Sequence, residues 1–427
     1  MTDFKILHDE KINEQYKYLK HKSGLDVYVF PKDMKLKVAL LGVKFGSVYE
    51  EGAIVDGKNV NFPSGIAHFL EHKLFSNEDG VDACTTLASV GADGNAYTSN
   101  NKTVYMFSCT ENFNLALEEL VDFVCNPYFT KENVKSEVGI ITQEIKMCND
   151  SPYDAVSQNL LVALYGDCKL SSDILGTEKT IKEISAEKLY ECYNSFYRFS
   201  NMSLVVCGDV DENEVLCVLD KILLKEDKRE APKLPCVSTH RRVVQPLIER
   251  IMPVSMPIFE IGIKDFQPNA NVEERLQRDV AMTILDEIIF SRAGELYNKM
   301  FESGLINESY TYGYSTTRDV AFHSVYGEGE DPNLVLKTIK EHIAKIKQNG
   351  INERDFIRCK RVMMAEYLRD FDSVDDIANS LLNLVFEGSD VFKYRKIIEQ
   401  VTLKDVEKCL NESFDEECFA LSVIKSN

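Results

Sequence analysis

The stretch GIAHFLEHKLF, at Gly65–Phe75, carries apolar residues at the spacing of a helix. His68 and His72 stand four residues apart in it, so a helix presents both imidazoles on one face, about one turn apart. Two nitrogen ligands of a tetrahedral Zn²⁺ ion need this arrangement. Glu71 follows His68 by three residues and lies on the same side, where a carboxylate reaches a water molecule at such a metal. The stretch therefore predicts a helix that supplies two metal ligands and a base.

The H-x-x-E-H order is the inverted form of the H-E-x-x-H helix of zinc peptidases. Histidine is scarce in this chain, with seven among 427 residues, whereas 69 residues are acidic. At those frequencies about 0.02 matches are expected by chance, for a motif that by itself is a hypothesis. The alternative is a pair of hydrogen-bonded histidines on a partly buried helix that binds no metal.

A catalytic zinc site takes a third protein ligand and leaves one position open. Residues 131–149 (KENVKSEVGIITQEIKMCN) predict a helix on which Glu137 and Glu144 lie two turns apart and share a face. Apolar neighbours predict that this face is partly buried, which is unusual for a carboxylate without a partner. The spacing leaves open which glutamate is the ligand, and without the histidine motif a solvated acidic face would be favoured. The remaining histidines have no motif-like neighbours: His8, His21, His240, His323 and His342.

The charge balance restricts the partners of this chain. Lysine and arginine number 49 against 69 aspartates and glutamates, which gives a net charge of −20. Such a surface repels phosphate backbones, so we expect no nucleic-acid partner, whereas an acidic cavity would still attract basic peptides. Hydrophobic residues make up 44% of the chain, enough for well-filled cores.

The sequence predicts a cytoplasmic protein without a membrane partner. Its first twenty residues contain no uninterrupted apolar segment of the kind found in a secretory signal. Apolar runs such as Met202–Cys207 are far shorter than the ~20 residues that a membrane span needs. The twelve cysteines include no C-x-x-C pair and no disulfide-like spacing, which favours reduced, mostly buried thiols.

Strand and helix patterns alternate along the first half. The strand patterns are Leu25–Pro31, Val38–Phe45 and Asn95–Ser108, the last with a turn at Asn100 and Asn101. Besides the histidine stretch, the helical patterns are residues 112–125, 131–149 and 154–165.

A charged segment with two prolines and no period, Lys225–Gln245, predicts a linker near the middle of the chain. We therefore expect a zinc-bearing N-terminal domain at residues 1–224 and a linker at 225–245. A related C-terminal domain without the zinc motif is expected at residues 246–427.

A weak internal repeat relates the two predicted domains. Ile184–Phe196 (ISAEKLYECYNSF) resembles Val401–Ser413 (VTLKDVEKCLNES), and an apolar strand pattern follows each segment. The pairing sets Ser185 against Thr402, Cys192 against Cys409 and Asn194 against Asn411. We predict an α+β fold of two related halves, each a mixed sheet covered by helices. The alternative is two amphipathic helices that are alike by chance.

Three segments together resemble the pitrilysin/insulinase superfamily of zinc peptidases, the inverzincins. They are GIAHFLEHKLF at residues 65–75, GADGNAYTSNNKTVY at 91–105 and SEVGIITQEI at 136–145. The half-length chain is similar to the mitochondrial-processing-peptidase-like branch and to bacterial YmfH-type proteins. The resemblance implies two α/β-sandwich halves that form half of a clamshell-type peptidase.

The resemblance also implies roles for individual residues. It makes His68, His72 and Glu144 the ligands of a zinc cofactor, and Glu71 the general base for attack of water on a peptide carbonyl. Glu137 matches a second carboxylate that supports catalysis at the site.

Further positions match the substrate-binding residues of the family. Asn95 and Ala96 match an edge strand to which a substrate peptide adds as an extra strand. Phe75 matches an aromatic residue at the pocket wall. On residues alone, a plain turn followed by a strand would be favoured for the segment around Asn95.

The second half departs from the family pattern. Many members carry an Arg and a Tyr there, in a segment like L-R-E-x-x-G-L-A-Y, that hold the substrate near the zinc. In the matching stretch (LYNKMFESGLINESY), Phe301 stands where the Arg would be and Asn307 lies near the expected Tyr. Tyr310 or Tyr312 can replace the tyrosine, but no arginine is at hand in this stretch.

These observations predict a zinc-dependent endopeptidase that hydrolyses short or unfolded peptides in an enclosed chamber. Because half-length members pair into clamshells, we expect a heterodimer whose zinc-less related chain supplies the Arg/Tyr function, or else a homodimer. The alternative function is a zinc-stabilised, non-catalytic scaffold or peptide-binding subunit of a hetero-oligomer.

Overall fold

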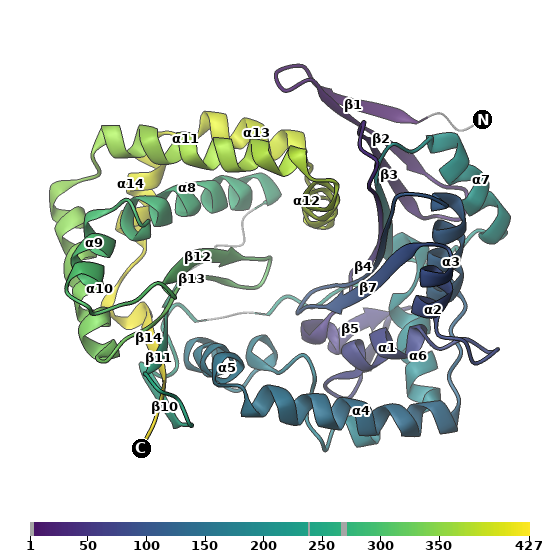
Figure 1. Cartoon of the computed structure of the whole chain (residues 1–427), viewed down its shortest axis with the longest axis horizontal. Coiled ribbons are helices and arrows are strands. Elements are labelled where there is room, and N and C mark those ends of the chain that lie inside the picture. Colours follow the sequence, from purple (N-terminus) through teal and green to yellow (C-terminus); the bar gives the residue numbers. More distant parts are fainter. Residues whose placement is uncertain (1–3, 238–239, 266–270) are drawn as a thin grey trace.

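The first half of the chain is built on a seven-stranded sheet (Figure 1). In sheet order its strands are β1 (Lys5–Asp9), β2 (Glu14–Lys20), β3 (Asp26–Pro31), β9 (Met202–Gly208), β4 (Lys37–Val43), β8 (Thr103–Cys109) and β7 (Ala92–Thr98). A separate ribbon pairs β5 (Glu51–Val55) with β6 (Lys58–Asn61). The helices are α1 (Ile66–Leu74), α2 (Ala83–Ser89), α3 (Phe113–Cys125), α4 (Lys131–Asp150), α5 (Pro152–Tyr165), α6 (Ala186–Phe196) and α7 (Glu212–Ile222). This computed structural model describes residues 4–237, 240–265 and 271–427.

The second half is built on a five-stranded sheet. In sheet order its strands are β10 (Leu247–Ile251), β14 (Phe419–Lys425), β11 (Ile258–Lys264), β13 (Ala321–Glu328) and β12 (Thr311–Thr316). Its helices are α8 (Val272–Phe290), α9 (Glu295–Glu302), α10 (Pro332–Asn349), α11 (Glu353–Arg369), α12 (Val374–Phe386), α13 (Val391–Gln400) and α14 (Leu403–Glu412).

The two sheets repeat one topology. In the first, β3 runs parallel to β9, and β9, β4, β8 and β7 follow as antiparallel neighbours. In the second, β10 runs parallel to β14, and β14, β11, β13 and β12 follow in the same way. Ser185 and Thr402 are the N-cap residues of α6 and α14, the helices that precede β9 and β14. The predicted α+β fold of two related, helix-covered halves is therefore confirmed.

The local predictions differ from the structure mainly at element ends. The strand pattern of Asn95–Ser108 forms the antiparallel pair β7 and β8, with the turn closed by the bond from Ser99 N–H to the Lys102 carbonyl. The predicted helix at residues 112–125 begins one residue later, because Asn112 adopts the left-handed conformation at φ 56°.

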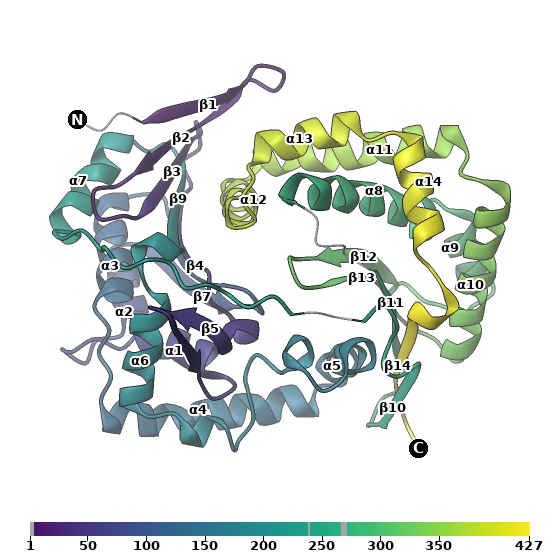
Figure 2. The same ribbon diagram turned by 180° about the vertical axis from the view of Figure 1, so that it is seen from behind.

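Each half donates one helix to the sheet of the other half. Helix α12 packs on β4 and β9 of the first sheet, and α5 packs on β11 and β14 of the second. Figures 1 and 2 show both helices end-on beside the partner sheet. A glycine lies under each: a Cβ at Gly42 would approach Leu382 and Phe386 of α12 to about 3 Å, and one at Gly262 would approach Leu160 of α5 to 2.7 Å. The glycines let the exchanged helices approach the strands closely.

The exchange bears on the predicted domain boundaries. The predicted linker, residues 225–245, contains no helix or named strand in its described part, although Lys233 makes a bridge to Ile54 of β5. Because α5 lies within residues 1–224 yet packs on the second sheet, the two halves share an apolar interface. The domain boundaries themselves stay a prediction.

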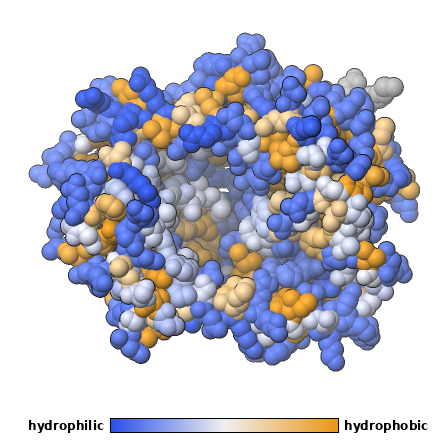
Figure 3. All heavy atoms as spheres, viewed as in Figure 1, coloured by the Kyte–Doolittle hydropathy of each residue, from blue (hydrophilic) through white to orange (hydrophobic). Residues whose placement is uncertain are grey.

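The halves enclose a hollow, which the space-filling view shows between them (Figure 3). Across residues 4–237, 240–265 and 271–427, no helix has the length and apolar character needed to cross a lipid bilayer.

Candidate metal centre and active site

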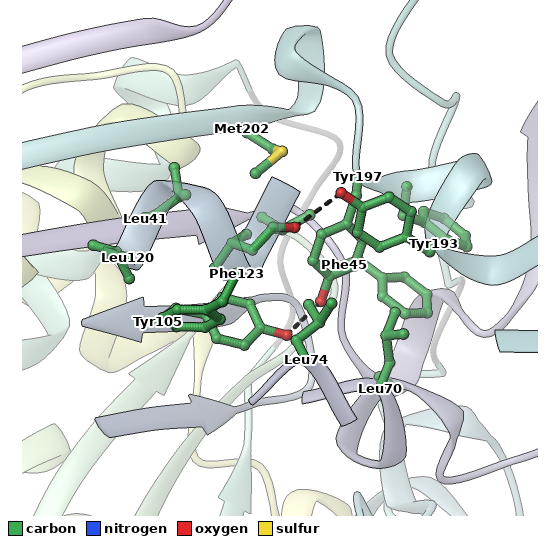
Figure 4. Close-up of a cluster of buried hydrophobic side chains, with 14 of the residues drawn as sticks. Leu41, Phe45, Leu70, Leu74, Tyr105, Leu120, Phe123, Tyr193, Tyr197 and Met202 are labelled. Atoms are coloured by element: carbon green, nitrogen blue, oxygen red, sulfur yellow. Dashed lines mark hydrogen bonds between the residues drawn. The ribbon is translucent and has the colours of Figure 1, made fainter. Parts of the chain in front are cut away.

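Helix α1 holds the histidine motif in place by its buried face. Leu70 and Leu74 of α1 are fully buried and gather with Phe45, Tyr105 and other apolar side chains of the first core (Figure 4). In the same core the Tyr105 and Tyr197 hydroxyls lie 2.7 Å apart in a hydrogen bond, so each of these buried hydroxyls has a partner. The apolar positions between His68 and His72 thus anchor the helix, and the polar positions face away from the core.

The start of α1 is fixed by two unusual contacts. Gly65, its N-cap residue, has φ +90°, and a Cβ there would lie 2.5 Å from the Leu175 carbonyl oxygen, so only glycine fits. Gly65 offers no side chain as a cap, and Glu50 takes that role from fifteen residues upstream. Glu50 Oε1 accepts hydrogen bonds from the N–H groups of Gly65 (3.0 Å) and Ala67 (3.1 Å). The carboxyl thus satisfies N–H groups at the helix start that would otherwise lack partners.

Helix α4 carries the two glutamates. It begins at a capping box of Thr130 with Asn133. Ile141 and Ile145 bury one side of the helix in the core, which turns Glu137 and Glu144 toward α1. The predicted shared face is therefore the face that meets the histidine helix.

The structure brings His68, His72 and Glu144 together. Glu144 Oε1 lies 3.7 Å from His68 Nε2, and Glu144 Oε2 lies 3.7 Å from His72 Nε2. One potential ligand atom from each residue falls within 4.8 Å of the other two. Ligand atoms on a tetrahedral zinc ion stand about 3.3–3.6 Å apart, given bonds of about 2.0–2.2 Å. The three side chains thus need only small movements to share one ion.

The electrostatics of the two histidines differ. Burial, together with the neighbouring His72, lowers the pKa of His68 to about 3, so its imidazole is neutral and keeps a lone pair for a metal. Burial by itself would lower the pKa of His72, but the hydrogen bond with Glu137 and the surrounding carboxylates raise it above its ordinary value. The raised pKa favours the doubly protonated ring. A divalent cation would take the place of the proton on Nε2, the nitrogen that faces Glu144.

The donor set fits a zinc ion. Two imidazoles and one carboxylate are the ligands of a known class of catalytic zinc site. His68 Nδ1 is buried and has no hydrogen-bond partner in the described part of the chain, while His68 Nε2 faces Glu144. The Nε2 atoms of both histidines are therefore the nitrogens turned toward the shared position.

Glu137 lies behind His72 instead of beside the ligand atoms. Its Oε1 is 3.0 Å from His72 Nδ1, and Lys73 Nζ donates to its Oε2 at 3.1 Å. A carboxylate in this position fixes the proton of the imidazole on Nδ1 and leaves Nε2 free for a metal. Glu144 thus lies beside the Nε2 atoms of both histidines, and Glu137 lies beside Nδ1 of His72. The roles of ligand and supporting carboxylate stay predictions.

Glu71 is a buried carboxyl on the same helix as both histidines. Burial raises the pKa of its carboxyl, against the hydrogen bond from Thr98 and the charge of His72, which lower it. Thr98 Oγ1 donates to Glu71 Oε2 at 2.5 Å and orients the carboxylate from the end of β7. A raised pKa suits a group that must exchange protons near neutral pH.

The predicted substrate positions lie around this cluster. β7 is an edge strand of the seven-stranded sheet, and Asn95 is exposed on it. The Ala96 N–H bonds to Asn95 Oδ1 at 2.8 Å, so this edge donor is met by a side chain that can rotate away. Phe75, just after α1, is partly buried and stacks on Phe123 with ring centroids 5.1 Å apart.

Tyr310 lies elsewhere, in the core of the second half. It is 1% exposed, and its hydroxyl donates to the Phe290 carbonyl at 3.1 Å. Its predicted contact with a substrate stays a prediction, and the hydroxyl has a structural partner in this conformation. The stretch 296–310 contains no arginine, and Arg292, just before it, donates to the Glu308 and Tyr310 carbonyls at 3.0 and 3.1 Å.

Three residues of the site escaped sequence reasoning. Thr98 lies inside a segment that was noted for its strand pattern and its family resemblance, but Thr98 itself was given no role, and Glu50 has no spacing relation to the motif. Lys73 stands next to His72, and a lysine in an otherwise apolar helix end was a signal that could have been used.

The helix cap gives a pH prediction. Burial raises the pKa of Glu50 from 4.5 to about 8, against the hydrogen bonds from Ala67 and Gly65 that lower it. The folded chain thus keeps a proton that the unfolded chain loses, so the contribution of Glu50 to stability is fully present below about pH 4.5 and is lost as the pH rises through about 8. Relative to Glu50→Gln, we expect wild-type unfolding free energy to fall by up to about 1.4 kcal/mol per pH unit across that window. Calorimetric melting curves at several pH values measure this, and parallel curves would contradict it.

Comparison with known proteins identifies the family. The family model of the insulinase peptidases (peptidase family M16) matches residues 33–178, and that of the M16 inactive domain matches residues 183–363. The uncharacterized zinc protease YmfH of Bacillus subtilis is 32% identical over 409 residues, which cover 94% of this chain and 95% of YmfH. The chain belongs to the M16 peptidase family.

Other M16 relatives agree with this assignment. The uncharacterized zinc protease YmxG of Bacillus subtilis is 25% identical over 324 residues, covering 73% of this chain and 76% of YmxG. The crystal structure of a putative M16-like peptidase from Alicyclobacillus acidocaldarius superposes with a TM-score of 0.91 at 27% identity, covering 100% of this chain and 99% of that one. The M16 relatives are named zinc proteases, and the His68–His72–Glu144 cluster lies in the segment matched by the insulinase model.

Proposed function

We propose that this chain is a zinc-dependent endopeptidase that cleaves short or unfolded peptides. The single observation that carries the proposal is the convergence of His68, His72 and Glu144, with Glu71 on the same helix as both histidines. A metal-ligand cluster without a neighbouring base would fit a purely structural metal site. This cluster has the buried carboxyl group of Glu71 beside it.

Each residue has a part in the proposed hydrolysis. A bound Zn²⁺ ion would supply Lewis acidity for activating water and polarising a peptide carbonyl. Glu71 takes the proton from the attacking water and returns it to the leaving amine, since burial raises the pKa of its carboxyl. Thr98 holds Glu71 in place during both transfers, and Glu137 keeps the His72 ring in one orientation.

The substrate is proposed to be an extended peptide. The edge strand β7 ends at Thr98, the residue that donates to Glu71, so a peptide added along β7 would bring its main chain past the base. The hollow between the halves supports access by chains without tertiary structure, since a folded domain would not fit an enclosed chamber (Figure 3).

The proposal extends to a paired state and a compartment. A related zinc-less chain, or a second copy of this one, would close the hollow and bring an Arg/Tyr-type group to the cluster. Twelve free cysteines support work in the reducing cytoplasm.

A second candidate is a non-catalytic scaffold or peptide-binding subunit that keeps zinc for stability. The observation that favours it is the match of residues 183–363 to the M16 inactive domain. It predicts that zinc removal lowers the melting temperature and that peptides bind without being cut.

One experiment separates the two candidates. The purified chain, loaded with zinc, is incubated with a mixed library of unstructured peptides, with and without chelator, and the products are read by mass spectrometry. Cleavage that stops on chelation and returns with zinc supports the peptidase. Peptide binding without cleavage, also after addition of any chain that co-purifies from the native host, would favour the scaffold.

A further inference from the structure

Lys73 is a buried cation immediately behind the metal cluster. It lies in the last turn of α1 and is 3% exposed. Its Nζ lies 3.1 Å from Glu137 Oε2 and 2.8 Å from Ser76 Oγ. A buried ammonium group destabilises a protein unless it is paired and hydrogen-bonded, and Glu137 and Ser76 are the groups that meet this need for Lys73.

The pairing divides the two oxygens of Glu137. Oε1 lies 3.0 Å from His72 Nδ1, and Oε2 takes the hydrogen bond from Lys73. Each oxygen of Glu137 therefore has its own neighbour, one on the metal-ligand helix face and one at the buried lysine. The last side-chain torsion of a glutamate can take a broad range of angles when its oxygens are free. Hydrogen-bond partners on both oxygens restrict that range.

We infer that Lys73 is a positioning residue for the metal centre: through Glu137 it fixes the ring orientation and the tautomer of His72. The inference rests on the proposed function, since it concerns the metal site of that function. His72 must keep its proton on Nδ1 to turn the Nε2 lone pair toward Glu144, and the ring can hold that state only if Glu137 stays in place.

The charge of Lys73 acts in the opposite direction to its positioning role. A cation near the site repels a divalent ion, so removing it would tighten metal binding if repulsion dominated. Because Glu137 pairs directly with Lys73 and neutralises it, we expect positioning to dominate. The sign of the change in zinc affinity therefore decides between the two.

The test is zinc affinity by competition with a chromophoric chelator, measured on the full-length chain. Lys73→Met keeps a long unbranched side chain without the charge, and we expect it to weaken zinc binding about 10-fold, within the range for outer-shell partners. Lys73→Gln keeps a hydrogen-bond donor and serves as the second variant if the methionine variant does not fold; we expect a smaller loss of zinc affinity than for Lys73→Met.

A matched control is available in the second half. Lys264 is also 3% exposed, and its Nζ donates to the Leu164 and Arg242 carbonyls, neither of which belongs to the His68–His72–Glu144 cluster. Lys264→Met should change the melting temperature and leave zinc affinity unaltered. That result would show that loss of a buried lysine is not enough to weaken the site.

A double-variant measurement of zinc affinity distinguishes a positioning role of Lys73 from a general contribution to fold stability. If Lys73 acts through Glu137, the double variant Lys73→Met/Glu137→Gln binds zinc no more weakly than Glu137→Gln alone. Additive losses, unchanged affinity or tighter binding in the single Lys73 variants would overturn the inference. Failure of the wild-type chain to bind zinc would instead overturn the proposed function.

Discussion

Glu71→Gln should remove peptide hydrolysis while zinc remains bound. The amide cannot take a proton from water, yet it has nearly the same shape and can still accept the hydrogen bond from Thr98. Because a positioned general base contributes about 10²–10⁴-fold to rate, we expect a loss of that order in kcat. Product formation from a peptide cleaved by the wild-type chain measures it, with zinc content determined on the same sample.

The control for this variant is a nearby carboxylate without a contact to the cluster. Glu78 is exposed a few residues beyond the end of α1, and Glu78→Gln should keep wild-type activity and zinc content. Full activity of the zinc-loaded Glu71 variant would show that another group is the base. Loss of both zinc and activity would mean that Glu71 contributes to metal binding as well.

Glu144→Ala should empty the metal site more thoroughly than Glu137→Ala. Glu144 brings both oxygens to within 3.7 Å of the histidine Nε2 atoms, whereas Glu137 contacts His72 through Nδ1. We expect zinc affinity to fall by more than about 100-fold for the ligand, and by about 10–100-fold for the supporting carboxylate. Zinc titration with a competing chelator and metal analysis after dialysis measure both losses.

The outcome ranks the two glutamates, which their spacing cannot do. Glu132, an exposed residue in the first turn of the same helix, provides the control, because Glu132→Ala changes the helix surface without touching the cluster. Equal losses for Glu137 and Glu144 would contradict the distinction between them, and a larger loss for Glu137 would reverse the roles assigned to them.

Much of the fold was predictable because its signals are local. Apolar spacing placed the strands at β3 and β4 and the helices at α1, α3, α4 and α5 to within a few residues. The repeat between Ile184–Phe196 and Val401–Ser413 was enough to predict two related halves. The exchange of α5 and α12 was not predictable, since each helix has one apolar face that would suit either sheet.

The candidate site was predictable where one helix carries it. The period of α1 sets His68, Glu71 and His72 on neighbouring positions of one short helix, whatever surrounds it. Thr98, Glu50 and Lys73 were missed because their roles depend on partners between 27 and 64 residues away in the chain, or on backbone N–H groups 15 and 17 residues away.

The sequence by itself determined the angular order of the candidate metal ligands about two helix axes, because the helical period fixes which side chains share a face. Only the tertiary structure decided what each face meets. It set Glu144 against the Nε2 atoms and Glu137 against Nδ1 of His72, placed Glu50 at the start of α1, and paired Lys73 with Glu137. The physical reason is that the helical period fixes only the angle at which each side chain leaves its own helix axis. A metal site also requires the right distances between ligand atoms on different helices, and core packing sets those distances.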